Sequence, residues 1–168
     1  MTQSLGKNTA LILGNYRTTL TVARTLNEEG FRVIVSDADN GAAGARYSRF
    51  VDEMWSHPQL DEGNGRAFRN AFDALLKSRP EITTIFPVEE AFVVWLAQNP
   101  EALPERITLV SPKSDLVELC LDKVRMLELA SGAGVECAPY ATVDTLDQLF
   151  LQSDRVGYPV IIRPFSHL

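Results

Sequence analysis

The first 110 residues alternate short apolar runs with segments of helical periodicity, and this alternation decides the fold class. Residues 9–13 form a continuous apolar run that ends at Gly14, and residues 31–35 form a second run. Between the two runs, apolar residues recur at the spacing of a helix. A strand, a helix and a strand in so short a span predict a right-handed crossover between two parallel strands.

The same alternation continues downstream. We expect further strands at residues 50–55, 82–86 and 107–110, a helix around the apolar stripe of residues 68–76, and another helix at residues 91–98. The sequence therefore predicts an α/β fold with a doubly wound, Rossmann-like parallel sheet.

The pattern changes after residue 112, where we place a domain boundary. Ser111 can cap a helix that carries Pro112 in its first position, and Asp144 can cap a later one. The other expected elements are a helix at residues 122–130 and strands at residues 139–143 and 158–163. The sequence thus predicts one domain over residues 1–112 and a smaller α+β segment over residues 113–168.

Composition excludes several classes of protein. The 168 residues are 45% hydrophobic and carry a net charge of -6, so the chain can fill a core but lacks the basic surface that binds nucleic acid. Its apolar runs are too short to cross a bilayer, so we expect no membrane partner and a cytoplasmic location.

Histidine and cysteine are scarce and isolated from one another. His57 and His167 have no recognisable catalytic partners in the sequence, and we expect both on the surface or in loops. Cys120 and Cys137 form no metal-binding or disulfide pattern, so we expect reduced, buried thiols and no metal site.

The turn after the first strand is a partial match to a dinucleotide-binding fingerprint. That fingerprint needs glycine where Tyr16 and Thr19 stand, so NAD(P) binding is the least favoured interpretation. Asp37 stands where a ribose-binding acid would be expected. Without the glycines, the favoured interpretation is that Asp37 caps a loop. Gly14 and Asp37 nevertheless lie where a parallel sheet collects ligands.

Two carboxylates, Glu89 and Glu90, follow the predicted strand at residues 82–86. Glu89 could face a ligand crevice at the carboxyl end of the sheet. The favoured alternative is that both side chains occupy the first turn of the next helix and interact with its dipole.

Residues 111–164 resemble the beginning of the ATP-grasp domain of biotin carboxylases, carbamoyl phosphate synthetase large chains and related carboxylate-amine ligases. The resemblance depends on Asp122-Lys123, Gly134-Val135, Pro139 and the segment Gly-Tyr-Pro-Val-Ile-Ile-Arg-Pro at residues 157–164, in that order. Residues 45–52 and 85–88 resemble the domain that precedes it in these enzymes. The two predicted domains would then be a pre-ATP-grasp domain and the start of an ATP-grasp domain.

The resemblance implies specific roles for two cationic residues. Lys123 and Arg163 match the positions that contact ATP phosphates, although biotin carboxylases carry lysine at the second position. Gly14, Asp37 and Glu89 are weaker candidates for the substrate site, and the resemblance implies a nucleotide and a small-molecule carboxylate as ligands. The glycine-rich loop and the magnesium ligands of these enzymes are expected after Leu168, so Mg²⁺ is implied only for a full-length enzyme and this chain alone is expected to be inactive.

Two alternatives remain open at this point. The chain could be a non-catalytic α/β binding or assembly module, or, less favoured, an NAD(P)-binding oxidoreductase. The apolar segment at residues 156–162 also predicts self-association, because an uncovered strand would expose unpaired backbone groups and apolar side chains to other molecules.

Overall fold

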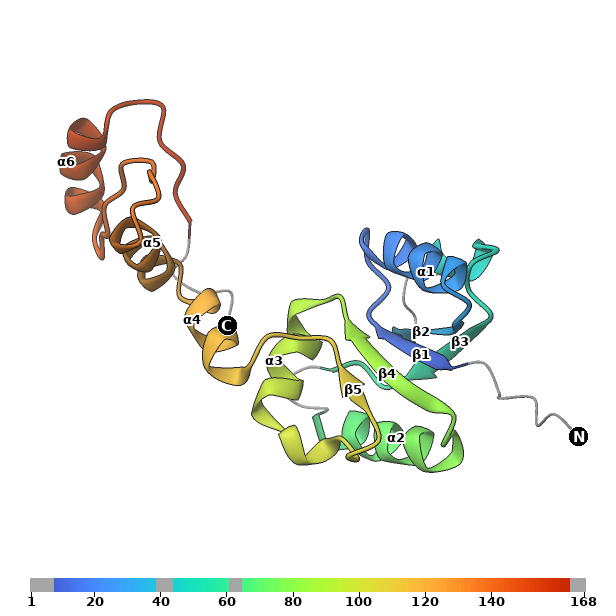
Figure 1. Cartoon of the computed structure of the whole chain (residues 1–168). Coiled ribbons are helices and arrows are strands. Elements are labelled where there is room, and N and C mark those ends of the chain that lie inside the picture. Colours follow the sequence, from blue (N-terminus) through green and yellow to red (C-terminus); the bar gives the residue numbers. More distant parts are fainter. Residues whose placement is uncertain (1–7, 39–43, 61–64, 164–168) are drawn as a thin grey trace, which may run out of the picture. The chain divides into compact units, whose positions relative to one another are not determined.

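The computed structural model of the chain describes residues 8–38, 44–60 and 65–163. The chain forms two compact units, Met1–Ser114 and Asp115–Leu168 (Figure 1). The first unit contains the whole sheet, and the second unit contains α-helices and irregular segments in its described part. The assignment of these units to a pre-ATP-grasp and an ATP-grasp domain stays a prediction.

A five-stranded parallel sheet organises the first unit, and its strand order is β3-β2-β1-β4-β5. The strands are β1 (Thr9–Leu13), β2 (Arg32–Ala38), β3 (Glu53–His57), β4 (Ile82–Pro87) and β5 (Thr108–Leu109). The chain runs outward from β1 to β3 and then returns to add β4 on the other side of β1. This reversal confirms the predicted doubly wound α/β fold.

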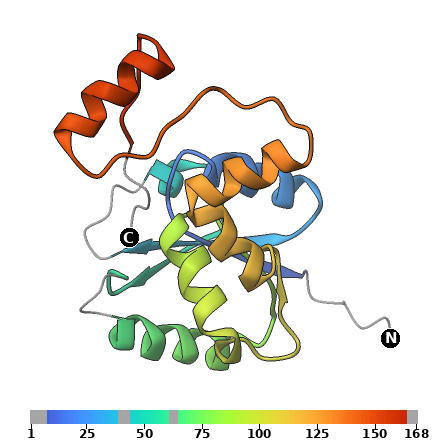
Figure 2. The ribbon, with the colours of Figure 1, turned by 90° about the vertical axis from the view of Figure 1, so that its left-hand side faces the viewer.

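Helices cover both faces of this sheet. The helix α1 (Thr19–Glu28) packs Ala23 and Leu26 against β1 and β2 on one face. The helices α2 (Gly65–Ser78) and α3 (Glu90–Gln98) cover the other face, and Figures 1 and 2 show α2 on the side of the sheet opposite to α1. Two short 3-10 helices, η1 (Gly44–Tyr47) and η2 (Pro100–Ala102), complete the unit.

The third strand begins three residues later than predicted. Phe50 and Val51 pack with the α1 face of the core instead of entering the sheet. The backbone N–H of Asp52 donates to the carbonyl of Val33, and its carboxylate accepts the N–H of Val33 in return. Pairing with β2 therefore starts only after Asp52.

The expectation that His57 lies on the surface or in a loop is wrong, because it is the buried last residue of β3. Its side chain is 2% exposed and packs among Trp55, Phe68 and Phe92, with ring centroids 4.8, 5.1 and 5.6 Å away. Its Nδ1 lies 2.8 Å from the carbonyl of Pro58, whereas its Nε2 has no hydrogen-bond partner. The residue belongs to the aromatic core between the sheet, α2 and α3, and His167 lies outside the described residues.

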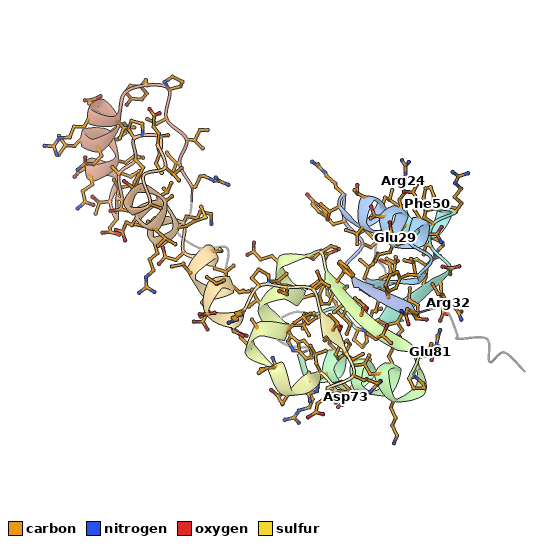
Figure 3. All side chains as sticks on the ribbon, in the orientation of Figure 1. Arg24, Glu29, Arg32, Phe50, Asp73 and Glu81 are labelled. Atoms are coloured by element: carbon orange, nitrogen blue, oxygen red, sulfur yellow. The ribbon has the colours of Figure 1, made fainter. Side chains whose placement is uncertain are left out.

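Ion pairs tie the amino ends of the strands to the end of α2. Arg79 donates both terminal nitrogens to Glu53, at 2.6 and 3.0 Å, and its Nε donates to Glu81 at 2.6 Å. Arg32 also donates to Glu53, at 2.9 Å. Figure 3 shows Arg32 and Glu81 at the same edge of the sheet. The hydrogen bond from Arg79 is the main reason that the pKa of Glu53 lies below its ordinary value, against an opposing effect of burial.

Helices alone, two of them with capped amino ends, make up the regular secondary structure in the described part of the second unit. The helix α4 spans Ser114–Leu121, so the predicted cap at Ser111 is wrong. Asp122 caps α5 (Lys123–Gly132) by accepting the N–H groups of Val124 and Arg125, both at 3.0 Å. Thr145 caps α6 (Leu146–Val156), where Asp144 was expected to do so.

The two strands predicted in this unit are absent. Residues 139–143 and 158–163 have no regular secondary structure. A strand needs a neighbour for its backbone hydrogen bonds, and the described part of this unit contains no strand that could pair with either segment. The apolar pattern of the second segment indicated burial, but Ile161 and Ile162 are 88% and 68% exposed.

The second unit has almost no core of its own. Within residues 115–163, only Val117 and Ser153 are buried. Large apolar side chains such as Leu146, Phe150 and Tyr158 are exposed.

Cys120 is exposed and Cys137 is half-buried, so the expectation of two buried thiols is wrong. None of the described helices has the length and apolar character needed to span a membrane.

Candidate functional sites

The first candidate site lies at the carboxyl edge of the sheet, where the strand order reverses between β1 and β4. Open parallel sheets bind ligands at such a point. Gly14 follows β1, and Glu89 follows β4 as the N-cap residue of α3. The N–H of Asn15 donates to Glu89 Oε1 at 2.7 Å, so the ends of β1 and β4 are joined directly.

Gly14 is required at this point by its backbone and by its neighbour. Its φ is +112°, a conformation that L side chains rarely adopt. A Cβ at this residue would lie 2.7 Å from Glu89 Cγ and 2.9 Å from both Cδ and Oε1. The absence of a side chain at Gly14 thus provides the space that the Glu89 carboxylate fills.

Both glutamates stand at the start of α3, where the favoured interpretation placed them, and the Glu89 side chain also faces the crevice. Glu90 is the exposed first residue of α3, as the helix-dipole interpretation predicts. The Glu89 side chain makes no capping hydrogen bond to α3 and turns to the β1 side of the crevice instead.

Asp37 also belongs to this site. It lies in β2, which extends to Ala38, and its side chain is 6% exposed. The loop that it was expected to cap includes residues 39–43, which lie outside the described residues. Asn15 Nδ2 donates to Asp37 Oδ1 at 3.3 Å, and Asn15 Oδ1 accepts the N–H of Ala45 at 3.3 Å. The structure therefore brings Gly14, Asp37 and Glu89 together around Asn15. The sequence interpretation missed Asn15, because its only signal was its position directly after Gly14.

The second candidate site is a cleft of about 480 Å³ inside the second unit. It is lined by residues of α5 and α6 and by the irregular segments 138–143 and 159–163. Both Lys123, the half-buried first residue of α5, and Arg163, which is exposed, line it. The two cations lie on one cleft although the strand predicted to carry Arg163 does not form.

The chemistry of this cleft differs from that of the whole chain. Its walls are mainly apolar, from residues such as Leu127, Val156 and Ile161, and none of the described residues that line it is acidic. The chain as a whole has a net charge of -6. Its volume lies within the range of small-molecule sites, and two cations on its lining favour an anionic ligand.

The residues that the structure describes do not form a metal site. No group of three or more histidine, cysteine, aspartate or glutamate side chains in residues 8–38, 44–60 and 65–163 could hold a metal ion. Glu89 and Asp37 are two carboxylates without a third ligand of this kind.

Comparisons with solved structures define the class of fold. The chain is similar to N5-carboxyaminoimidazole synthetase from Staphylococcus aureus, solved with ADP, with a TM-score of 0.65 and 18% identity over 95% of this chain and 39% of that one. It is also similar to the biotin carboxylase domain dimer of Hydrogenobacter thermophilus 2-oxoglutarate carboxylase, in complex with MgADP, ADP and bicarbonate. That match has a TM-score of 0.59 and 19% identity over 90% of this chain and 33% of that one. The chain therefore shares its fold with a part of each of these two enzymes.

The curated relatives include two further kinds of enzyme, while no family model matches the chain. The carbamoyl phosphate synthase large chain of Thermotoga sp. is 25% identical over 60 residues, which are 36% of this chain and 6% of the relative. The formate-dependent phosphoribosylglycinamide formyltransferase of Bifidobacterium longum is 26% identical over 128 residues, which are 76% of this chain and 29% of the relative. The chain thus spans less than a third of either relative.

These neighbours and relatives confirm the predicted resemblance to the ATP-grasp superfamily. The chain is similar to biotin carboxylase, to the N5-carboxyaminoimidazole ribonucleotide synthetases and to carbamoyl phosphate synthase.

Proposed function

We propose that this chain corresponds to the amino-terminal part of an ATP-dependent carboxylate-amine ligase. In such an enzyme ATP would phosphorylate a small carboxylate, and an amine or a similar nucleophile would then displace the phosphate from the acylphosphate. Lys123 and Arg163 would bind nucleotide phosphates in the cleft of the second unit. The crevice around Gly14, Asp37 and Glu89 would contribute to the site of the amine nucleophile, because its two carboxylates disfavour a second anion.

The observation that carries the proposal is that two cations, Lys123 and Arg163, line one cleft. A phosphate chain requires fixed positive charge, and the two side chains supply it in different forms. Arg163 offers a planar fork of N–H donors, and Lys123 offers a compact point charge. The apolar walls of the cleft suit the flat base of a nucleotide. Two of the similar solved enzymes contain ADP, one of them with magnesium.

We propose that Mg²⁺ accompanies the nucleotide in the full-length enzyme. The similar biotin carboxylase domain was solved with MgADP. We also propose that the chain alone has no ligase turnover, which agrees with its coverage of 39% of the synthetase chain. Sustained ATP-dependent phosphate release by the chain in a coupled assay would contradict this second statement.

Calorimetric titration with ADP tests the binding proposal. We expect weak binding to the wild-type chain and a loss of affinity of about tenfold or more in Lys123→Ala and in Arg163→Ala, because each variant removes a charge-assisted contact. Arg155→Ala is the matched control, since Arg155 lies in the last turn of α6 and does not line the cleft. Equal affinity in all four proteins, or no binding to the wild type, would favour the alternative of a non-catalytic binding or assembly module.

A further inference from the structure

We propose that Glu89 is a specificity-determining residue that occupies the anion position of the first β-α turn and keeps phosphate groups out of the first unit. In many doubly wound folds this turn and the following helix bind a phosphate through backbone N–H groups. Here a side chain of the protein itself takes that place. The inference concerns the first unit only and holds whether or not the second unit binds a nucleotide.

The hydrogen bonds of the turn are the first line of evidence. The N–H of Gly14 donates to Ser36 Oγ at 2.8 Å, that of Asn15 to Glu89 Oε1 at 2.7 Å, and that of Tyr16 to Thr19 Oγ1 at 2.8 Å. Three successive N–H groups are thus used by side-chain oxygens of the chain. Only one of the three acceptors, Glu89, carries a charge, so Glu89 is the acceptor that imitates a bound anion.

The space around Gly14 is the second line of evidence. A glycine at such a turn allows a ligand phosphate to approach the backbone closely. At Gly14 the space that a Cβ would fill is already taken, because Glu89 Cγ, Cδ and Oε1 lie 2.7 to 2.9 Å from that position. A phosphate cannot make the same approach until the Glu89 side chain moves away.

Electrostatics act in the same direction. A phosphate at Asn15 would meet the Glu89 carboxylate and also that of Asp37, whose Oδ1 lies 3.3 Å from Asn15 Nδ2. Like charges at such short range are strongly unfavourable in a partly buried site. The first unit therefore repels phosphate at the crevice, while the second unit presents a cleft with two cations.

Amide chemical shifts measured during a titration with inorganic pyrophosphate test this role. The shifts of Gly14, Asn15 and Tyr16 report binding at the turn, and those of residues in α5 report binding in the other unit separately. We expect no response of the turn in the wild type, and binding at least about tenfold tighter in Glu89→Ala, because a competing anion has been removed. Glu89→Gln, which removes the charge but keeps an oxygen acceptor, should gain less. Glu90→Gln is the matched control, since Glu90 is exposed and adjacent, and it should behave as the wild type.

Two results would overturn the inference. One is a wild-type turn that binds pyrophosphate as tightly as Glu89→Ala does. The other is a folded Glu89→Ala variant whose turn gains no affinity. If Glu89→Ala does not fold, the same judgement applies to Glu89→Gln, and the absence of any gain in that variant contradicts the proposal. A response confined to α5 in every protein would support the proposed nucleotide cleft while refuting the role of Glu89.

Discussion

Replacement of Gly14 by alanine should destabilise the first unit through two separable effects. The backbone at this residue has a φ of +112°, and holding an L residue in a left-handed conformation costs about 1–2 kcal/mol. The new Cβ would also meet three Glu89 atoms at 2.7 to 2.9 Å, so the carboxylate must move and release the N–H of Asn15. Loss of a hydrogen bond to a charged group costs about 1.5–3 kcal/mol. We expect a total loss of about 2.5–5 kcal/mol, a large part of the usual stability of a domain, which is about 5–15 kcal/mol.

Gly30→Ala separates the two effects. Gly30 has a φ of +84°, and a Cβ there would meet nothing within 4 Å. This variant should therefore show the backbone cost alone, about 1–2 kcal/mol. Glu89→Ala should lose the hydrogen bond alone. In the double variant Gly14→Ala/Glu89→Ala that bond is lost only once, so the two single costs should exceed the double cost by about 1.5–3 kcal/mol.

Urea unfolding followed by tryptophan fluorescence measures these differences in the correct unit. The chain has two tryptophans, Trp55 and Trp95, and both pack against the core between the sheet, α2 and α3. The reasoning is refuted if Gly14→Ala is no less stable than Gly30→Ala, or if the costs of Gly14→Ala and Glu89→Ala simply add.

Three further predictions concern charge, capping and association. Glu53→Gln should lower the stability of the first unit by about 1 kcal/mol at neutral pH. Because Arg79 lowers the pKa of Glu53 in the folded state, the difference in unfolding free energy from the wild type should shrink as the pH falls below about 4.5. A constant difference across that range would contradict this prediction. Asp122→Ala should destabilise α5 by about 1 kcal/mol, seen as faster amide hydrogen exchange in its first turn, and unchanged exchange would contradict the capping role. The exposed Ile161 and Ile162 predict self-association, so light scattering should give a mass above that of one chain and Ile161→Asp/Ile162→Asp should reduce it, whereas a strictly monomeric wild type would refute the expectation.

The sequence predicts the first unit well because its signals there are local and agree with its packing. The runs that became β1 and β2 are buried on both faces, and the stripe of α2 points Phe68 and Phe72 into the core. The burial of His57 could not be predicted, because a lone histidine in the sequence does not indicate the three aromatic residues that surround it in space. The hydrogen bond between Asn15 and Glu89 joins residues 74 positions apart, so no local pattern could indicate it.

The second unit was harder to predict for a different reason. The apolar segment at residues 158–163 has the pattern of a strand. A strand requires a neighbouring strand for its backbone hydrogen bonds, and the described part of this unit contains no strand. The caps of α5 and α6 depend on residues next to each helix. Thr145 caps α6, whereas Asp144 was predicted, because two adjacent polar residues are equivalent candidates in sequence. The predicted Lys123 and Arg163 do line one cleft, although the secondary structure expected around Arg163 is absent.

Photolabelling with 8-azido-ADP, followed by mass-spectrometric mapping of the labelled peptides, tests the central claim most directly. The account predicts labels only within residues 123–163 of the second unit, suppressed by excess ADP and strongly reduced in Lys123→Ala. Labels on the peptides that carry Gly14 or Asp37, or labels in the second unit that persist unchanged in Lys123→Ala and Arg163→Ala, would contradict the account.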